Sequence, residues 1–263
     1  MPRTIQLHDR TAILARLADH RALNVYAVGD LDDMFFPYTS WFALEEAGQV
    51  LQVVMLYTGG ALPMIHAIAG DRLGELRALL ASLLPVLPRS FYMHVTPGVS
   101  DVLAPDYDIS PRGLHHKMVL VDPSRLDDLD TSTAAPLAPA DRDEVLAFYE
   151  AAYPGNWFDP RMLETGRYTG VRVDGALACV AGVHVFSRLY RVAALGNIAT
   201  HPSFRRRGLG TIATAACCRR LLTDCNTIGL NVHSSNADAI RIYERLGFAV
   251  VGPYEEALAT ARR

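Results

Sequence analysis

The sequence lacks the long apolar segments that membrane and secreted proteins carry. No stretch approaches the 18 or more apolar residues that a bilayer-spanning helix needs, and the first nine residues have no apolar block of a secretory signal. Net charge is also small, at -3 over 263 residues, so nothing draws the chain as a whole to nucleic acid or to an anionic membrane. We therefore expect a cytoplasmic protein that binds no nucleic acid and no membrane.

Cysteine is scarce as well. The chain has four, Cys179, Cys217, Cys218 and Cys225, and none forms a CxxC pair. The adjacent Cys217 and Cys218 fall in an expected helix, where their side chains would point about 100 degrees apart and could not share a metal in the usual way. We expect no metal site, and buried thiols in a reducing compartment.

The composition is that of a globular protein with room for two domains. Half of the residues are hydrophobic and 20% are charged. Residues 123–139 are rich in Asp, Ser, Thr, Ala and Pro and show no sustained apolar period, which is typical of a linker. We expect an N-terminal domain over 1–121, a linker over 122–139 and a C-terminal domain over 140–263.

In the C-terminal half, apolar periodicity and turn residues predict one helix followed by a strand-rich region. Asp174-Gly175 is a strong hairpin signal, Asn236 is suited to cap a helix, and Gly247 is suited to end it. The expected helices are 141–153, 209–223 and the one opened by Asn236; the expected strands are 168–173, 176–186, 192–200, 227–232 and one that begins at 248.

The N-terminal half shows a fainter version of the same order. We expect strands over 41–45, 50–57, 63–69, 90–95 and 117–121, with a helix over 71–84. No sequence identity between the halves is strong enough to be called a repeat. A duplication of the fold is therefore a hypothesis that rests on the order of elements alone.

Residues 198–211 place a strand, a basic glycine turn and a helix start in succession. Gly208 and Gly210 have no side chains, so the backbone can approach a ligand closely and turn consecutive N–H groups toward it. The free amides and the positive end of the helix dipole favour an anion there. The segment therefore predicts a phosphate-binding turn.

This turn resembles motif A of the GNAT superfamily of N-acetyltransferases, Arg/Gln-x-x-Gly-x-Gly/Ala, with Arg205, Gly208 and Gly210 in the diagnostic places. About 25 residues further on, a strand and then Asn236, Ala239, Tyr243-Glu244 and Leu246-Gly247-Phe248 are similar to the second signature of that family. Two motifs in the right order are far more specific than one. The resemblance implies an α/β (α+β) fold with two GNAT-like domains, each a mixed, mostly antiparallel sheet flanked by helices.

The N-terminal domain looks like a degenerate copy, as in the tandem, glycine N-acyltransferase-like branch of that superfamily. The place before its helix, residues 67–73, has a single glycine and carries Asp71 where a phosphate would have to sit. We expect this half to bind no coenzyme A.

The resemblance also implies an activity: transfer of an acetyl group from acetyl-CoA to an amine, which attacks the thioester directly. Tyr243 would protonate the departing thiolate, and the backbone N–H of Ile198 would stabilise the oxyanion. The implied cofactor-binding residues are Ile198, Ala199, Thr200, Arg205, Arg206, Arg207, Gly208, Leu209, Gly210, Thr211 and Asn236.

The general base is missing from its usual place. Many family members carry a glutamate eleven residues before the motif A Arg/Gln, where this chain has Ala194. His184, His201 and His233 titrate in the right range, and Asn197 is suited to orient a water molecule. The sequence does not choose among them. A non-catalytic acyl-CoA-binding sensor or regulatory protein is therefore the alternative function.

Two other classes of function have weaker support in the sequence. Residues 208–213 also fit the dinucleotide fingerprint G-x-G-x-x-A, but no acidic residue ends the next strand at Asn231-Val232, and a Walker A loop would need a lysine. Nucleic-acid binding by the arginines at 205–207, 219 and 220 is disfavoured by the acidic net charge.

The acceptor is open between a small-molecule amine, an amino-acid conjugate and a peptide or protein N-terminus. Tyr153, Trp157 and Phe158, with Asp30, Asp32 and Asp33 from the other half, are the candidates for lining its pocket.

Overall fold

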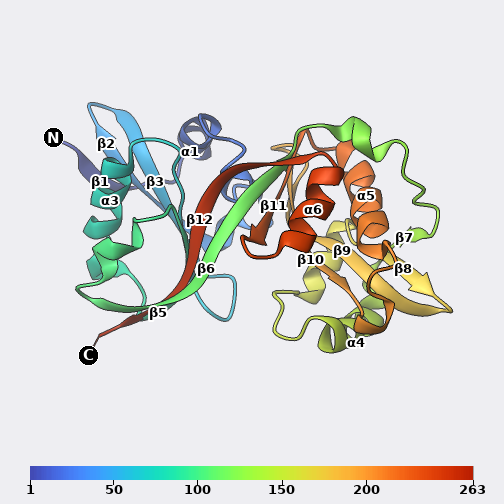
Figure 1. Ribbon diagram of the computed structural model, residues 1–263. Helices are drawn as coiled ribbons and strands as arrows, with labels where there is room; N and C mark the ends of the chain where they lie inside the picture. The colour runs from blue at the N-terminus through green and yellow to red at the C-terminus, as the bar shows by residue number, and fades with distance from the viewer. Residues whose placement is uncertain (263) are drawn as a thin grey trace. The chain divides into compact units, whose positions relative to one another are not determined.

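The computed structural model describes residues 1–262, which form two compact units (Figure 1). Unit 1 contains Met1–Lys117, Val232–Ser235 and the chain from Val250 onward; unit 2 contains Met118–Asn231 and Asn236–Ala249. Each unit is therefore assembled from separate stretches of sequence, whereas we expected contiguous domains. The expected linker, 122–139, lies within unit 2.

Unit 1 is a sheet with helices, in the strand order β1-β2-β3-β4-β5-β12-β6. Neighbouring strands are antiparallel from β1 to β4 and between β5 and β12, whereas β4 and β5 are parallel and are connected through α3. Its elements are β1 (Arg3–Gln6), α1 (Arg10–Ala18), α2 (Val25–Gly29), β2 (Thr39–Glu46), β3 (Gln49–Tyr57), β4 (Met64–Ala67), α3 (Leu73–Ser82), β5 (Ser90–Val95) and the larger parts of β6 (Tyr107–Leu120) and β12 (Phe248–Ala261).

Unit 2 has the strand order β11-β10-β9-β8-β7, in which β10 and β11 are parallel and the other pairs antiparallel. Its elements are β7 (Ala134–Pro136), α4 (Arg142–Ala152), β8 (Thr169–Val173), β9 (Ala176–Ser187), β10 (Val192–Thr200), α5 (Leu209–Leu222), β11 (Thr227–His233) and α6 (Ala237–Arg245). Figure 1 shows α5 and α6 on one side of these strands and α4 on the other.

Most expected elements are present, and the exceptions have physical causes. All the elements expected in the C-terminal half lie within a few residues of their predicted bounds. The strand expected at 117–121 is the end of β6, which begins ten residues earlier; Pro111 and Gly113 lie inside it and read as strand breakers. Within 122–139, Leu126 and Leu137 are buried and β7 pairs with β8, so two leucines anchor a polar segment.

The cores of the two units are apolar, and the cysteines belong to the core of unit 2. In unit 1, Leu76, Leu79 and Leu80 of α3 recur at helical spacing and pack with the buried strand residues. In unit 2 all four thiols are free and buried. Burial raises the pKa of Cys179 to about 11 and that of Cys217 to about 12, so these thiols stay protonated.

One face of unit 1 also buries a row of ionisable side chains across four neighbouring strands. His66 of β4, His94 of β5 and Glu256 of β12 stand opposite one another in the sheet register. His94 Nε2 lies 3.3 Å and His115 Nε2, from β6, 3.7 Å from Glu256 Oε1. His66 is only 3% exposed, and neither of its ring nitrogens has a hydrogen-bond partner among residues 1–262. Burial, and then the charges of Lys117 and His94, lower the pKa of His66.

Lys117, the single lysine of the chain, is buried beside this row. It is 2% exposed, and its Nζ lies 4.7 Å from the ring centre of Tyr254 and 5.1 Å from that of Tyr26, with no hydrogen-bond partner in the described part of the chain. Burial lowers the pKa of Lys117 to about 7, and the charge of Glu256 opposes this only in part. The cation–π contacts therefore do not replace the lost hydration.

This burial predicts a pH-dependent stability. Between pH 7 and the ordinary lysine value of 10.5, the unfolded chain holds one more proton at Lys117 than the folded chain does, so the free energy of unfolding rises with pH. From pH 7.0 to 8.5 the contribution of Lys117 to this rise should be about 1–2 kcal/mol. The buried thiols and Asp30 oppose the rise, but they do so equally in a variant that lacks only the lysine. In urea unfolding, the free energy should therefore rise with pH more steeply, by this amount, in the natural protein than in Lys117→Met. Equal slopes in the two proteins would contradict the assignment.

Candidate active site

The candidate site of unit 2 begins where its two parallel strands part. Val192–Leu195 of β10 pair with Thr227–Leu230 of β11, and the pairing ends there. β10 continues to Thr200, and from Gly196 onward most of its residues are half-buried rather than buried. One backbone edge of β10, from Gly196 to Thr200, is therefore left without a neighbouring strand on the β11 side.

A bulge in β10 occupies this opening. The register against β9 shifts between Gly196 and Ala199, so Asn197 and Ile198 have no partner residue on β9. Asn197 has a φ of 53°, a left-handed conformation that is uncommon for residues other than glycine. The bulge thus turns the backbone of Ile198, the expected oxyanion donor, out of the regular ladder.

Side chains of the α4 face hold the bulge. The Tyr149 hydroxyl donates to the Asn197 carbonyl oxygen at 2.6 Å, and Asn197 Nδ2 donates to the Tyr168 hydroxyl at 3.0 Å. The Tyr168 hydroxyl in turn donates to the Val183 carbonyl oxygen at 3.1 Å. Burial raises the pKa of both phenols, so both remain proton donors. Asn197 is thereby held in its left-handed conformation through both its backbone and its side chain. The sequence did not indicate this arrangement.

The turn after β10 presents a run of free backbone donors. Arg206 and Gly208 have φ of 63° and 76°, and the first helical bond of α5 runs from the Ile212 N–H to the Gly208 carbonyl at 3.1 Å. The amides of 206–211 have no hydrogen-bond partner among the described residues. Consecutive free amides at a helix start form an anion-binding concavity. The turn that the sequence predicts to bind phosphate therefore leaves these amides free for an anion.

The arginines and Gly210 complete this turn. Arg205, Arg206 and Arg207 are exposed, and Arg205 Nε donates to the Thr200 carbonyl oxygen at 3.5 Å. A Cβ on Gly210 would lie 3.6 Å from Thr200 Oγ1, so the last residue of β10 and the start of α5 lie close together. A larger side chain at 210 would therefore enter the space between them.

Asn231 is a functional candidate that the sequence reasoning did not single out. It is the first residue of β11 beyond the paired stretch, and its Oδ1 is buried with no hydrogen-bond partner within 1–262. Such an acceptor is costly to bury unless water or a ligand supplies a donor. The only signal in the sequence was an asparagine inside an otherwise apolar strand.

Asn236 caps α6 and Tyr243 lies on it, both as expected. The Asn236 side chain caps the helix by accepting from the Ala239 N–H at 3.2 Å, so its oxygen has a structural role and its amide NH₂ is the group left for a ligand. Tyr243 is 9% exposed, and burial raises its pKa above the ordinary value, followed by smaller effects of nearby groups including Cys218. Its hydroxyl therefore stays protonated through the neutral range.

The three candidate histidines have different surroundings. His201 Nδ1 accepts from the Ser203 N–H at 3.3 Å and caps a short turn, and His233 Nδ1 accepts from the Ser235 N–H at 3.2 Å. The His184 ring instead lies over β10, because a Cβ on Gly196 would fall 1.8 Å from its Cδ2 and 2.2 Å from its Nε2. Of the three, only His184 packs on the bulged strand of unit 2.

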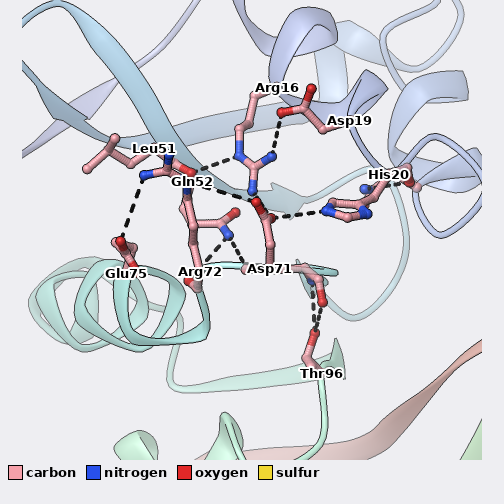
Figure 2. A network of polar contacts seen from close by, with 11 residues as sticks. Arg16, Asp19, His20, Leu51, Gln52, Asp71, Arg72, Glu75 and Thr96 are labelled. Carbon is pink, nitrogen blue, oxygen red and sulfur yellow. Dashed lines mark hydrogen bonds and ion pairs between the residues drawn. The ribbon is translucent and has the colours of Figure 1, made fainter.

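The corresponding place in unit 1 is closed. β4 and β5 stay paired to Ala67 and Val95, and the Thr96 N–H then donates to the Ala67 carbonyl oxygen at 3.0 Å. At the start of α3 the Asp71 carboxylate binds Arg16 and lies 3.2 Å from His20 Nε2 (Figure 2). Gln52 Nε2 donates to the Asp71 carbonyl oxygen at 2.8 Å. Strand pairing, an acid and its ion pairs fill the place that is open in unit 2.

The candidate acceptor residues divide between the units. In unit 2, Trp157 is 55% exposed and Tyr153 is also exposed, whereas Phe158 packs 4.9 Å from Tyr149 and 5.5 Å from Tyr168, centre to centre. In unit 1, Asp30 is buried, and burial raises its pKa to about 7; Asp33 is exposed and pairs with Arg10. Phe158 therefore belongs to the group that holds the bulge.

Residues 133–248, most of unit 2, match the model of the acetyltransferase (GNAT) family. Over 57 residues the chain is 47% identical to the ribosomal protein bS18-alanine N-acetyltransferase of Salmonella typhimurium, covering 21% of this chain and 38% of that protein. Over 80 residues it is 29% identical to N-alpha-acetyltransferase 30 of Xenopus laevis, covering 30% and 29%. The chain thus spans well under half of either relative.

Solved structures show that the fold extends over nearly the whole chain. A Drosophila protein aligns with a TM-score of 0.69 at 15% identity over 98% of both chains. A tandem GNAT protein from the clavulanic acid biosynthesis pathway aligns with a TM-score of 0.57 at 18% identity, over 99% of this chain and 98% of its own. The expected mixed, mostly antiparallel GNAT-type fold is confirmed. No helix in residues 1–262 is long and apolar enough to cross a membrane.

The left-handed φ of Asn197 leads to a stability prediction. Asn197→Val places a β-branched residue in this conformation and also removes a hydrogen bond, so it should cost about 2–3 kcal/mol. Asn197→Gly removes the same hydrogen bond but relieves the strain, and should cost about 1 kcal/mol or less. The free energy of unfolding in urea measures both. Equal losses in the two variants would show that the backbone conformation is not the determinant.

Proposed function

We propose that this chain is an acetyl-CoA-dependent N-acetyltransferase whose active site lies in unit 2. The observation that carries the proposal is the run of free amides at 206–211, directly after a strand whose edge has lost its neighbour. A pyrophosphate needs the first feature, and an extended amide-bearing arm needs the second. The family match over 133–248 supports the same chemistry.

The residues present fit coenzyme A. The amides of 206–211 would hold its phosphates, with Arg205, Arg206 and Arg207 adding positive charge, while the open edge of β10 at Ile198, Ala199 and Thr200 would pair with its pantetheine arm. The orphaned Asn231 Oδ1 is an acceptor for an N–H of that arm. When bound, acetyl-CoA supplies an acetyl group activated as a thioester.

The chain's own groups then stabilise charge and move protons. In the bulge, Ile198 presents its N–H to the carbonyl oxygen on which negative charge develops. Tyr243 donates from its hydroxyl to the departing sulfur. Because its pKa is raised above 10, this phenol is a weaker acid than a thiol, and it acts mainly by a strong hydrogen bond to the developing thiolate.

The acceptor is an amine, and a peptide N-terminus is one defined class to test. The Salmonella relative is named for acetylating the alanine of a ribosomal protein, and the Xenopus relative for acetylating α-amines. Small-molecule amines are the other class, and membership of the glycine N-acyltransferase-like branch remains a prediction. Ala194 stands where the resemblance places a glutamate base, which keeps an acyl-CoA-binding sensor as the second candidate. Binding of acetyl-CoA without turnover of any amine would favour the sensor.

Calorimetry with acetyl-CoA tests the cofactor site. Gly210→Val should push a branched side chain into the space beside Thr200 and weaken binding on the order of 10-fold or more, because it obstructs the amide turn. The natural protein should bind one equivalent per chain, since the corresponding place in unit 1 is closed by strand pairing and by Asp71.

A matched control is Gly74→Val on the first turn of α3, where a Cβ would meet nothing within 4 Å. It makes the same change in helix propensity, in unit 1, and should leave acetyl-CoA affinity unchanged. Unchanged affinity in Gly210→Val would overturn the site in unit 2. A stoichiometry near two would overturn the closed state of unit 1.

Tyr243→Phe tests the proton donor. The change removes only the hydroxyl, so kcat should fall on the order of 100-fold or more while acetyl-CoA affinity holds. Because the pKa of Tyr243 is raised, the kcat profile of the natural protein should show no loss attributable to this phenol below pH 10. The measurement is release of free coenzyme A with a panel of peptide and aliphatic amines. Near-full turnover in the variant would leave Tyr243 as a packing residue.

A further inference from the structure

We propose that His184 is the proton acceptor of the acetyl-transfer reaction, taking the proton of the attacking amine either directly or through one water molecule. The inference rests on the proposed function and deepens it, because it assigns the general base that the sequence left open. The juxtaposition that carries it is a histidine ring from β9 lying over Gly196, two residues before the bulged Ile198 on β10.

The bulges of the two strands bring this ring into place. Leu195 pairs with Val183 and Ala194 with Val185, so His184 is the extra residue of β9 at the first register shift. Two residues along β10 comes the second shift, which leaves Asn197 and Ile198 outside the ladder. A bulge re-aims the side chain of its extra residue. Here the two irregularities are adjacent, so the re-aimed imidazole and the displaced Ile198 amide belong to one region.

The ring lies on the α4 face of the sheet. Gly196 pairs directly with Gly182, and paired residues of an antiparallel ladder point to the same face. A Cβ on Gly182 would strike the Tyr168 ring, which packs against Phe158 and bonds Asn197. The α5 side of the sheet carries the free amides that would hold coenzyme A. His184 is therefore on the opposite side, where an amine can approach a thioester between the strands without crossing the cofactor.

The chemistry and the surroundings suit this role. A general base must lie near the amine and accept its proton, and a ring nitrogen of imidazole can do so. His184 is half-buried, so solvent can reach it to take the proton away afterwards. The usual position, Ala194, is fully buried, so a carboxylate there would lose its hydration. The other two candidates lie elsewhere: His201 follows the end of β10 and caps a turn, and His233 belongs to unit 1.

The step balances with two protein groups. The amine nitrogen forms a bond to the acetyl carbon, and the carbon–sulfur bond breaks. The proton lost by the nitrogen passes to Nε2 of His184, and the hydroxyl proton of Tyr243 is shared with or passes to the leaving sulfur. After release of the amide and coenzyme A, His184 returns its proton to solvent, and Tyr243 regains its own if it was transferred.

The first test is kinetic. His184→Gln keeps a polar side chain of similar length but cannot accept the proton. It should lower kcat/KM on the order of 100- to 1,000-fold for alanine-initiated tetrapeptides and aliphatic amines. The acidic limb that the base imposes on the profile of the natural protein should also disappear. Acceptor amines titrate equally in both proteins, so the difference between profiles belongs to the protein. His8→Gln, an exposed histidine of unit 1, is the matched control and should keep rate and profile.

A second variant leaves the imidazole in place and moves it. Gly196→Ala adds a Cβ that would fall within 2.5 Å of three ring atoms of His184, so the ring must shift. Turnover should fall while calorimetry still shows acetyl-CoA binding. Full turnover in this variant would contradict the assignment.

Nuclear magnetic resonance of the histidine side chains needs no acceptor. The ring signals of His184, assigned by their loss in His184→Gln, should move when acetyl-CoA is added, and those of His8 should not. If calorimetry shows binding but the His184 signals and the acidic limb are unaffected by ligand and variant, the inference is overturned and the proposed function stands. If acetyl-CoA does not bind at all, the proposed function falls together with the inference.

Discussion

Backbone donors and acceptors that two parallel strands leave unpaired must find other partners, and this constraint governs unit 2. β10 and β11 separate after Leu195 and Leu230, and the left-handed turn at Asn197 keeps β10 from rejoining a regular ladder. Tyr149 and Tyr168 stabilise that conformation from the α4 side. Water can satisfy these groups in the free protein, because most residues of the opening are half-buried. An extended ligand with amides along its length could replace that water, and this is the role that we propose for the opening.

Unit 1 has the same order of elements, but its parallel strands do not separate. Its parallel strands stay paired to their ends, and Asp71 with Arg16 occupies the helix start that in unit 2 is lined by free amides. An anion would meet a carboxylate there. Unit 1 also buries Lys117 and the His66 row on its sheet, at a cost in desolvation. The two units therefore share an architecture and differ in which polar groups are left to a ligand.

The sequence indicated the elements of unit 2 well because its turns are marked by residues with one structural use. Asp174-Gly175 forms a hairpin and Asn236 caps α6, each as expected, and Gly208 precedes α5 with a positive φ. It could not indicate α1 or β1, because short elements are stabilised by long-range packing rather than by local signals. Nor could it show that the chain from Val250 onward belongs to unit 1. Strand partners are chosen in three dimensions, and β12 has no local feature that selects β5.

The proposed site was harder to predict from the sequence, because its chemistry depends on which faces of the strands lie next to each other. Gly182 and Gly196 are opposite each other, and the space that two missing side chains leave is filled by the rings of Tyr168 and His184. From the sequence each glycine reads only as a weak position in a strand. Together they leave room for the rings of Tyr168 and His184 to lie close to the sheet beside the bulge. The place on β10 where the resemblance puts the glutamate is occupied by the fully buried Ala194, whereas His184 of β9 is half-buried and lies over the same strand. If His184 is the base, as we propose, the absent glutamate is a change in which strand supplies the base, and the requirement for a base is unchanged.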